Sequence, residues 1–226
     1  MTIREHSIYD CILSNAQNFP KETALVSGDL RLTFAEVPLH VNCLARGLLN
    51  TGFEKGDRIA VLLNNCAEYA LLLAACSRIG LIAVCLNTRT SADEMRMVLE
   101  STKPKALLFQ TILEEQAEAL RDLLPAQQLY SIDEAAILST SFDQFIDEDY
   151  SLLTEPQPGV DEGWMIIPTA AVDGIPKGAL LSQRNVMASA AVHLQHFGRE
   201  AINGHLLALP IFHVMGLTSA WATFIS

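Results

Sequence analysis

The chain has 226 residues, of which 50% are hydrophobic and 18% charged, and its formal net charge is −11. This apolar content supplies a sizeable core, which excludes wholesale disorder, and 12 glycines and 9 prolines are too few for a collagen-like or low-complexity chain. The acidic balance argues against a nucleic-acid partner, because phosphate contacts require clustered lysine and arginine. Residues 110–162 hold 13 of the 26 acidic residues and one basic residue, which predicts a solvated acidic surface in that region.

The cysteines predict a reducing environment. They are odd in number, form no C-x-x-C pair and lie in apolar sequence, as is typical of reduced thiols in a core: Cys11, Cys43, Cys66, Cys76 and Cys85. The first residues lack the apolar run of a signal peptide. We therefore expect a cytoplasmic location.

The N-terminal elements are two helices and a hairpin. Ser7 precedes an amphipathic helix that closes before Pro20, and residues 24–32 form a short hairpin around a Gly28-Asp turn. Thr33 and Glu36 have the spacing of a capping box, in which the two side chains satisfy amides at a helix start. The helix that they begin is expected to run to about residue 50.

Strands and helices then alternate. Continuous apolar strands are predicted at 58–63, 81–86, 106–109 and 129–132. Helices are predicted at 67–79, at 111–124 and from a second capping box, Ser91 to Glu94, to about residue 101. Apolar strands between amphipathic helices indicate an α/β fold with a mainly parallel sheet and helices on both faces.

The last third begins with a polar connection at 139–163. A strand at 164–167, a loop at 168–178, a short strand at 179–181, a helix at 184–197 and a strand at 206–209 are predicted after it. We expect one α/β subdomain over 1–160 and the start of a second over 161–226.

The C-terminal tail has two interpretations. Residues 206–225 contain no Asp, Glu, Lys or Arg, which meets the length rule for a membrane span. Pro210 and His213 interrupt the run and no basic cluster flanks it, so a strand followed by a helix is favoured over a membrane-inserted protein.

Generic catalytic motifs are absent from the sequence. It has no G-x-G-x-x-G, no G-x-x-x-x-G-K-[ST], no G-x-S-x-G and no H-E-x-x-H pattern. His193 and His196 have a ligand-like spacing on a helix, but no third ligand lies at a recognisable distance, so we predict no metal site.

The loop from Thr169 to Gly178 carries the clearest chemical signal. Its glycines let backbone amides face outward beside Lys177, and such a loop binds polyphosphate. A strand-joining turn with a Pro-Lys-Gly corner has a similar sequence, so this pattern alone leaves both interpretations open.

Five segments of the chain carry known motifs in a fixed order. Gly174-Ile-Pro-Lys-Gly178, with Thr169 before it, matches the end of a phosphate loop of the pattern T-S-G-T-T-G-x-P-K-G, and the segment 209–217 matches a later Pro-x-Phe-His-x-x-Gly motif. The three upstream segments are Leu32–Glu36, Gly56–Val61 with Asn64, and Ile79–Gly80 through Val84–Asn87. Together they resemble the N-terminal part of an acyl-CoA synthetase of the adenylate-forming superfamily.

The resemblance implies a two-step reaction. A carboxylate attacks the α-phosphate of ATP to give an acyl-adenylate and pyrophosphate, and the acyl group then passes to the thiol of coenzyme A. Mg²⁺ and cationic side chains neutralise the phosphates in such chemistry. By resemblance, the β- and γ-phosphates are held by Thr169, Gly174, Lys177 and Gly178, and the acid pocket is bordered by Phe212, His213 and Gly216.

The chain departs from the family pattern at two places. Residues 170–173 read Ala-Ala-Val-Asp instead of Ser-Gly-Thr-Thr, and Asp173 adds a negative charge, so Ala170 and Asp173 are not assigned to phosphate. The family's adenine contacts, its Mg²⁺-binding glutamate and its catalytic lysine come later than Ser226, so no catalytic residue is assigned.

We therefore expect an incomplete member of the fold. The first hypothesis is the N-terminal part of an ATP-dependent ligase that joins a carboxylic acid, a fatty acid by general resemblance, to coenzyme A and is inactive in isolation. The alternative is a catalytically dead family member that serves as a binding or scaffold module. A homodimer is compatible with either hypothesis.

Overall fold

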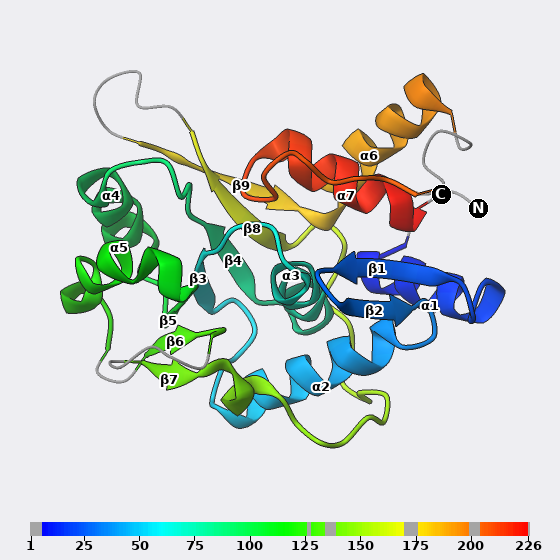
Figure 1. The fold of residues 1–226 in the computed structure, drawn as a ribbon, viewed down its shortest axis with the longest axis horizontal. Helices are drawn as coiled ribbons and strands as arrows, with labels where there is room; N and C mark the ends of the chain where they lie inside the picture. The colour runs from blue at the N-terminus through cyan, green and yellow to red at the C-terminus, as the bar shows by residue number, and fades with distance from the viewer. Residues whose placement is uncertain (1–5, 126–127, 134–138, 170–175, 199–203, 226) are drawn as a thin grey trace.

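A seven-stranded sheet lies at the centre of the computed structural model, which describes residues 6–125, 128–133, 139–169, 176–198 and 204–225 (Figure 1). The strand order is β7-β6-β5-β3-β4-β8-β9. Every neighbouring pair is parallel except the hairpin of β8 and β9, so the predicted mainly parallel sheet is confirmed. The strands are β3 (Arg58–Leu62), β4 (Ile82–Cys85), β5 (Ala106–Phe109), β6 (Leu129–Ser131), β7 (Thr140–Ser141), β8 (Gly163–Pro168) and β9 (Gly178–Ser182).

Helices cover both faces of the sheet because successive side chains of each central strand point to opposite faces. Ile59 and Val61 of β3 pack with the first helices of the chain, α1 (Ile8–Asn18), α2 (Val37–Asn50) and α3 (Ala67–Ile79). Ala60 and Leu62 pack on the other face with α4 (Ala92–Thr102) and α5 (Glu114–Glu118). The predicted two-faced α/β arrangement is therefore confirmed.

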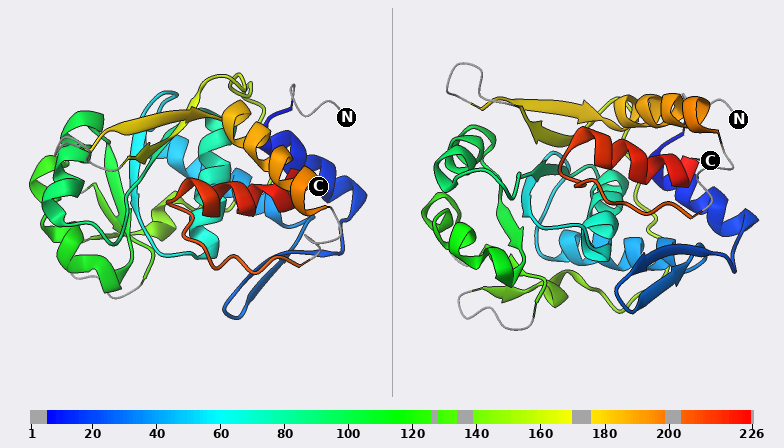
Figure 2. Two further views of the ribbon diagram at one scale, coloured as in Figure 1. Left: turned by 90° about the horizontal axis from the view of Figure 1, so that it is seen from above. Right: turned by 45° about the horizontal axis from the view of Figure 1, so that its top comes forward.

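The C-terminal helices lie on the same face as α1 and α3. The views in Figure 2 show α6 (Gln183–Phe197) and α7 (Val214–Ile225) side by side, and they contact each other closely. Trp221 of α7 packs on Trp164 of β8, with ring centroids 5.6 Å apart. One turn further along α7, the Asn15 side chain of α1 donates a hydrogen bond of 2.7 Å to the Phe224 carbonyl. The tail is therefore fastened to the N-terminal helix.

Most predicted elements have the expected bounds. Helix α3 and strand β5 match residue for residue, and helix α4 begins at the predicted capping box of Ser91 and Glu94. Helix α3 ends where Gly80 adopts a left-handed conformation, with φ of 78°. The hairpin also forms, as β1 (Thr23–Ser27) and β2 (Leu30–Thr33).

The predicted capping box at Thr33 is wrong in its placement. The hydroxyl of Thr33 donates to the Glu36 carboxylate at 2.7 Å, and residues 34–36 form a turn before α2 begins at Val37. Pro38 occupies the first turn of that helix, where its missing N–H costs nothing.

The predicted helix at 111–124 is also wrong, because the segment breaks into a short helical piece, α5, between two 3₁₀ turns, η2 (Thr111–Leu113) and η3 (Arg121–Leu123). The connection at 139–163 holds a short strand, β7, and a 3₁₀ turn, η4 (Phe142–Phe145), whose Phe145 is fully buried.

The connection that follows η4 is fastened by a buried arginine. Arg78 of α3 is 3% exposed, and its guanidinium donates to the carbonyls of Leu153 and Glu155 at 2.7 and 2.9 Å. The same group lies over the Tyr9 ring, 5.3 Å from its centroid. One cation therefore joins the connection to α1 and α3.

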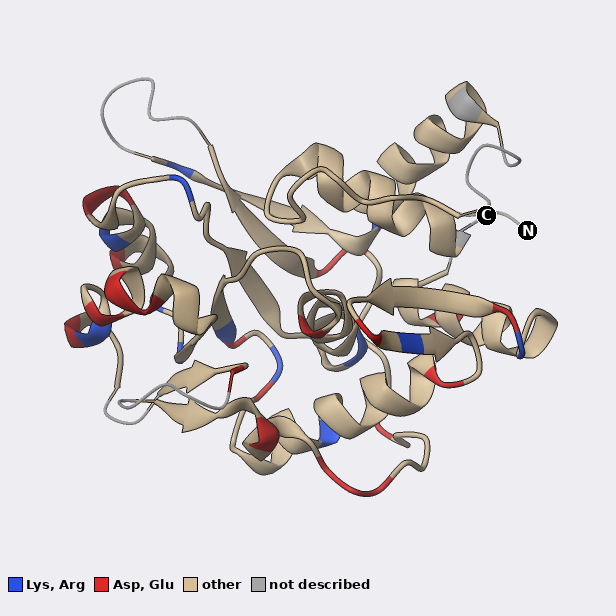
Figure 3. Cartoon of the chain, viewed as in Figure 1, with Lys and Arg blue, Asp and Glu red and all other residues tan. Residues whose placement is uncertain are grey.

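The described acidic residues of 110–162 are exposed or half-buried, as predicted, and Figure 3 shows them on α5, η3 and the connection. The five cysteines are free; four are buried and Cys66 is half-buried. Among the described residues, no helix has both the length and the hydrophobicity that a membrane span requires. The subdomain boundary near residue 160 stays a prediction, and β8 beyond it pairs directly with β4.

Candidate active site

Polar side chains gather where β3 and β4 end. Asn64 and Asn65 follow β3, and Asn87, Thr88 and Arg89 follow β4. Since β3 and β4 are adjacent and parallel, their carboxyl ends lie at one edge of the sheet, which is where α/β proteins bind ligands. This edge is the candidate site.

An irregular segment, residues 204–213, crosses this edge and leads into α7. The Asn65 amide donates to the carbonyls of Leu207 and Leu209 at 3.1 and 2.8 Å. Its oxygen accepts a bond of 2.8 Å from the Ile211 amide. Three hydrogen bonds from one side chain therefore place the segment beside the strand ends.

The predicted strand at 206–209 is wrong because this segment pairs with no strand. Two of its carbonyls are satisfied by the Asn65 side chain instead of by a neighbouring backbone.

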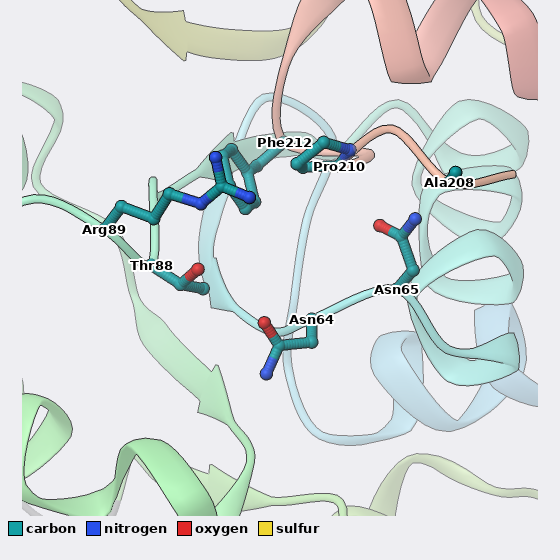
Figure 4. A pocket seen from close by; sticks show the side chains of 7 residues that line it. All are labelled: Asn64, Asn65, Thr88, Arg89, Ala208, Pro210 and Phe212. Carbon is teal, nitrogen blue, oxygen red and sulfur yellow. The ribbon is translucent and has the colours of Figure 1, made fainter.

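Two adjoining hollows lie between the segment and the strand ends, with volumes of about 180 and 260 Å³. Arg89, Pro210 and Phe212 line both hollows, so we describe them together as the strand-end cleft. Figure 4 shows Arg89 reaching from the end of β4 toward Phe212, with Thr88 and Asn64 along the opposite side. The remaining lining residues are Asn65, Asn87, Ala208, Leu209, His213, Met215 and Gly216.

The structure brings the three predicted pocket residues together. Phe212 is buried, His213 is exposed, and Gly216 lies in the first turn of α7, and all three line the larger hollow. A Cβ atom at Gly216 would lie 2.1 Å from the Pro210 carbonyl oxygen, so only glycine lets α7 start so close to the segment. The His213 amide donates to that same carbonyl at 3.1 Å.

Three of the predicted phosphate-binding residues, Thr169, Lys177 and Gly178, lie where strands β8 and β9 meet their connecting loop. The Thr169 amide and hydroxyl both donate to the Lys177 carbonyl, at 2.6 and 3.0 Å. The Lys177 side chain is exposed. A Cβ atom at Gly178 would lie 2.5 Å from a methyl group of Ile166, so glycine allows the two strands to pair closely there.

Part of the predicted loop falls outside the described residues: Gly174 and the altered stretch 170–173. Between described residues, no hydrogen bond or ion pair joins Thr169 or Lys177 to the strand-end cleft. The assignment of these residues to phosphate therefore stays a prediction.

The described residues do not form a metal site on their own. They contain no group of three His, Cys, Asp or Glu side chains placed to hold an ion. His193 lies 3.5 Å from the Ser219 hydroxyl, and this contact joins α6 to α7.

No role was predicted from the sequence for the polar lining residues at the strand ends, among them Asn65, Thr88 and Arg89. Arg89 is the only lysine or arginine among the described residues that line the cleft, and within the described part of the chain its side chain has no ion pair. The available signal was position, because polar residues directly after adjacent parallel strands lie at the ligand-binding edge.

Comparisons with known proteins identify the family to which the chain belongs. The model of the AMP-binding enzyme family matches residues 13–226. A 2-succinylbenzoate–CoA ligase of Bacillus pumilus is 28% identical over 214 residues, which are 95% of this chain and 41% of that protein. A medium-chain fatty-acid–CoA ligase of Escherichia coli is 27% identical over 219 residues, 93% of this chain and 39% of that protein.

A solved structure gives the same match. O-succinylbenzoate coenzyme A synthetase from Bacillus subtilis, in complex with ATP and magnesium ion, superposes with a TM-score of 0.79 at 27% identity. The match covers 98% of this chain and 55% of that one. The chain spans about two-fifths of the length of the curated relatives, in their N-terminal part. The family match over residues 13–226 shows that the chain belongs to the AMP-binding enzyme family and has the fold of the N-terminal part of adenylate-forming CoA ligases.

Proposed function

We propose that the chain forms the N-terminal part of an ATP-dependent ligase that joins a carboxylic acid to coenzyme A. The acid's carboxylate attacks the α-phosphate of ATP, pyrophosphate leaves, and the acyl group of the adenylate passes to the coenzyme A thiol. One observation carries the proposal. The motif residues Phe212, His213 and Gly216 line one hollow at the carboxyl edge of the sheet, where α/β proteins bind ligands, in a chain that matches the AMP-binding enzyme family.

The acid occupies the larger hollow of the strand-end cleft. Leu209, Phe212 and Met215 give this hollow an apolar wall. Its volume of about 260 Å³ is just below the usual range for small-molecule sites, which suits a small acid or one end of a longer acid.

We propose a fatty acid as the substrate, because the apolar wall fits an alkyl chain and one relative is named for a medium-chain fatty acid. An aromatic acid is the second candidate, because another relative is named for 2-succinylbenzoate.

The nucleotide's phosphates are held at the loop that joins β8 to β9. Lys177 is exposed and supplies a positive charge there, and Gly174 and Gly178 belong to the same glycine-containing loop in the sequence. The Thr169 hydroxyl donates a hydrogen bond to the Lys177 carbonyl, so Thr169 contributes by positioning the backbone of Lys177. Magnesium ion bound with ATP would neutralise phosphate charge in such a site.

We further propose that the 226 residues alone do not complete the reaction, because they match only the N-terminal part of the relatives. The alternative is a binding module without catalysis. It is favoured by the altered loop at 170–173, where three hydroxyl-bearing residues and one glycine of the family pattern are replaced and Asp173 adds a negative charge.

An ATP–pyrophosphate exchange assay tests the proposal. It is run on the longest protein that contains this chain and on the 226-residue chain, with medium-chain fatty acids and 2-succinylbenzoate. We expect acid-dependent exchange in the longer protein and none in the chain alone. Absence of exchange with every acid, in a longer protein that still binds ATP, would support the binding-module alternative.

A further inference from the structure

Asn65 uses its whole side-chain amide on one segment of the chain. Both N–H groups donate, to the Leu207 and Leu209 carbonyls, and the oxygen accepts from the Ile211 amide. The residue is exposed, so water could have satisfied the same groups. Three bonds to backbone 142 to 146 residues away instead show a side chain that selects a long-range conformation.

The three partners are alternate residues, 207, 209 and 211. The segment bends around this amide. The Ala208 amide donates to the Leu206 carbonyl at 3.0 Å and residues 211–213 turn toward α7, so one compact side chain reaches all three groups. Asn65 thereby satisfies backbone groups of a segment that pairs with no strand among the described residues.

The other side of the segment is fixed by α7. The absence of a side chain at Gly216 lets the first turn of the helix lie directly against the Pro210 and Leu209 carbonyls. Pro210 and Phe212 therefore lie in a segment confined between α7 and Asn65, and both residues form the wall of the strand-end cleft. A change at Asn65 releases one of the two constraints on that wall.

We propose that Asn65 is a positioning residue for the acid, an inference that rests on the proposed function. It holds the wall formed by Pro210 and Phe212 at the distance that defines the acid pocket. Its loss widens the choice of acid as well as weakening acid binding, because a wall in several positions accepts several shapes.

The test uses three variants of the 226-residue chain. Asn65→Ala removes all three bonds, and Asn65→Asp keeps the shape and the acceptor but turns carboxylate oxygen toward the Leu207 and Leu209 carbonyls. Asn18→Ala is the matched control, because Asn18 is also an exposed asparagine but bonds only Ser14 within its own helix. Melting temperature and circular dichroism establish that each variant is folded.

Two measurements are made on each folded variant. Hydrogen exchange at the Ile211 amide reports whether the segment is held. Calorimetric titration with octanoate and with 2-succinylbenzoate gives the affinity for each acid and the ratio between them. Loss of the three hydrogen bonds is expected to lower the affinity for the preferred acid by about tenfold and to bring the ratio of the two affinities closer to one.

The expected result is faster exchange at Ile211, weaker acid binding and a smaller ratio in both Asn65 variants, with Asn18→Ala unchanged. Faster exchange with unchanged affinities would overturn the positioning role and leave the proposed function intact. If the Ile211 amide stays protected from exchange in Asn65→Ala, Asn65 does not hold the segment and the proposal is overturned. If the unmodified chain binds neither acid while Ile211 is protected, the proposed acid hollow fails, and the role of Asn65 toward an acid fails with it.

Discussion

The central sheet and the segment 204–213 are held in place by different forces. Strands β3 and β5 are buried on both faces, and their backbone groups pair with neighbouring strands along their length. The segment contributes no strand among the described residues. Its Ile211 and Phe212 side chains are buried, but residues 204–209 are exposed or half-buried, and the segment's path depends on the Asn65 side chain and the close approach of Gly216. The sheet is therefore stabilised by many interchangeable contacts, while the candidate site depends on a few specific contacts.

The largest expected effect is on the sheet. Leu108 of β5 is fully buried, so Leu108→Ala is expected to lower the free energy of unfolding by about 2–5 kcal/mol. Urea denaturation measures the change. The control is Leu206→Ala in the segment, where 87% of the residue is exposed and the change should stay within about 0.5 kcal/mol. Equal losses in the two variants would contradict the comparison.

The next effect is on the segment. Gly216→Ala places a methyl group 2.1 Å from the Pro210 carbonyl oxygen, so α7 must shift, at a cost of about 1–3 kcal/mol. We expect a moderately lower melting temperature together with loss of acid binding. In the control Gly159→Ala, the new methyl group meets only the end of the flexible Glu162 side chain, at 3.3 Å. Intact acid binding in Gly216→Ala would show that the wall tolerates movement.

A third prediction concerns the phosphate loop. Asp173 places a negative charge where phosphate is expected, so the double variant Ala171→Gly, Asp173→Thr should bind ATP about tenfold more tightly. Calorimetric titration with ATP measures the affinity, and Lys177→Ala should weaken binding in the same assay. An unchanged affinity in the double variant would mean that this loop does not carry the nucleotide.

A smaller effect is expected at Tyr69, inside the body of the protein. Its side chain is fully buried, and its hydroxyl lies beside the Cys85 thiol, a weak partner, with no regular hydrogen bond to any described residue. Tyr69→Phe removes this unsatisfied group and should raise the free energy of unfolding by up to about 1 kcal/mol. Tyr130→Phe is the control, because its hydroxyl donates to Gln128 and its removal should not stabilise. A loss of stability in Tyr69→Phe would reveal a partner for the phenol.

The last prediction concerns the response of stability to high pH. Burial raises the pKa of the Cys11 and Cys85 thiols to about 11 and that of Cys66 to about 12, from an unfolded value of 9.0. These thiols stay neutral in the fold and ionise first in the unfolded chain, so their contribution is complete below pH 9 and is lost as the pH rises toward 11–12. Urea denaturation at pH 7.5 and 10.5 should show a smaller loss for Cys66→Ser than for the unmodified chain. An equal loss of stability in Cys66→Ser and in the unmodified chain would show that ionisation of Cys66 does not contribute.

The sheet could be predicted from sequence because its signals are local. The continuous apolar runs of β3 and β5 and the capping box of Ser91 and Glu94 specify their own elements. The prediction of one helix at 111–124 was wrong. This segment lies outside the central sheet, and its apolar pattern fits both one helix and a series of shorter turns.

The candidate site could be predicted only in part. Phe212, His213 and Gly216 carry a recognisable motif, and the structure places them in one hollow. The role of Asn65 could not be read from the sequence, because its partners lie more than 140 residues away. The same long-range contact explains why 206–209 has the pattern of a strand but does not join the sheet.

The central claim is that the strand-end cleft binds the acid, and a backbone NMR titration tests it most directly. The ¹⁵N-labelled chain is titrated with octanoate and, separately, with 2-succinylbenzoate. The account predicts saturable shifts at the amides of Phe212, His213 and Gly216 and at Arg89, with little change along α1 and β1. Shifts confined to other surfaces, or none at saturating concentrations of either acid, would contradict it.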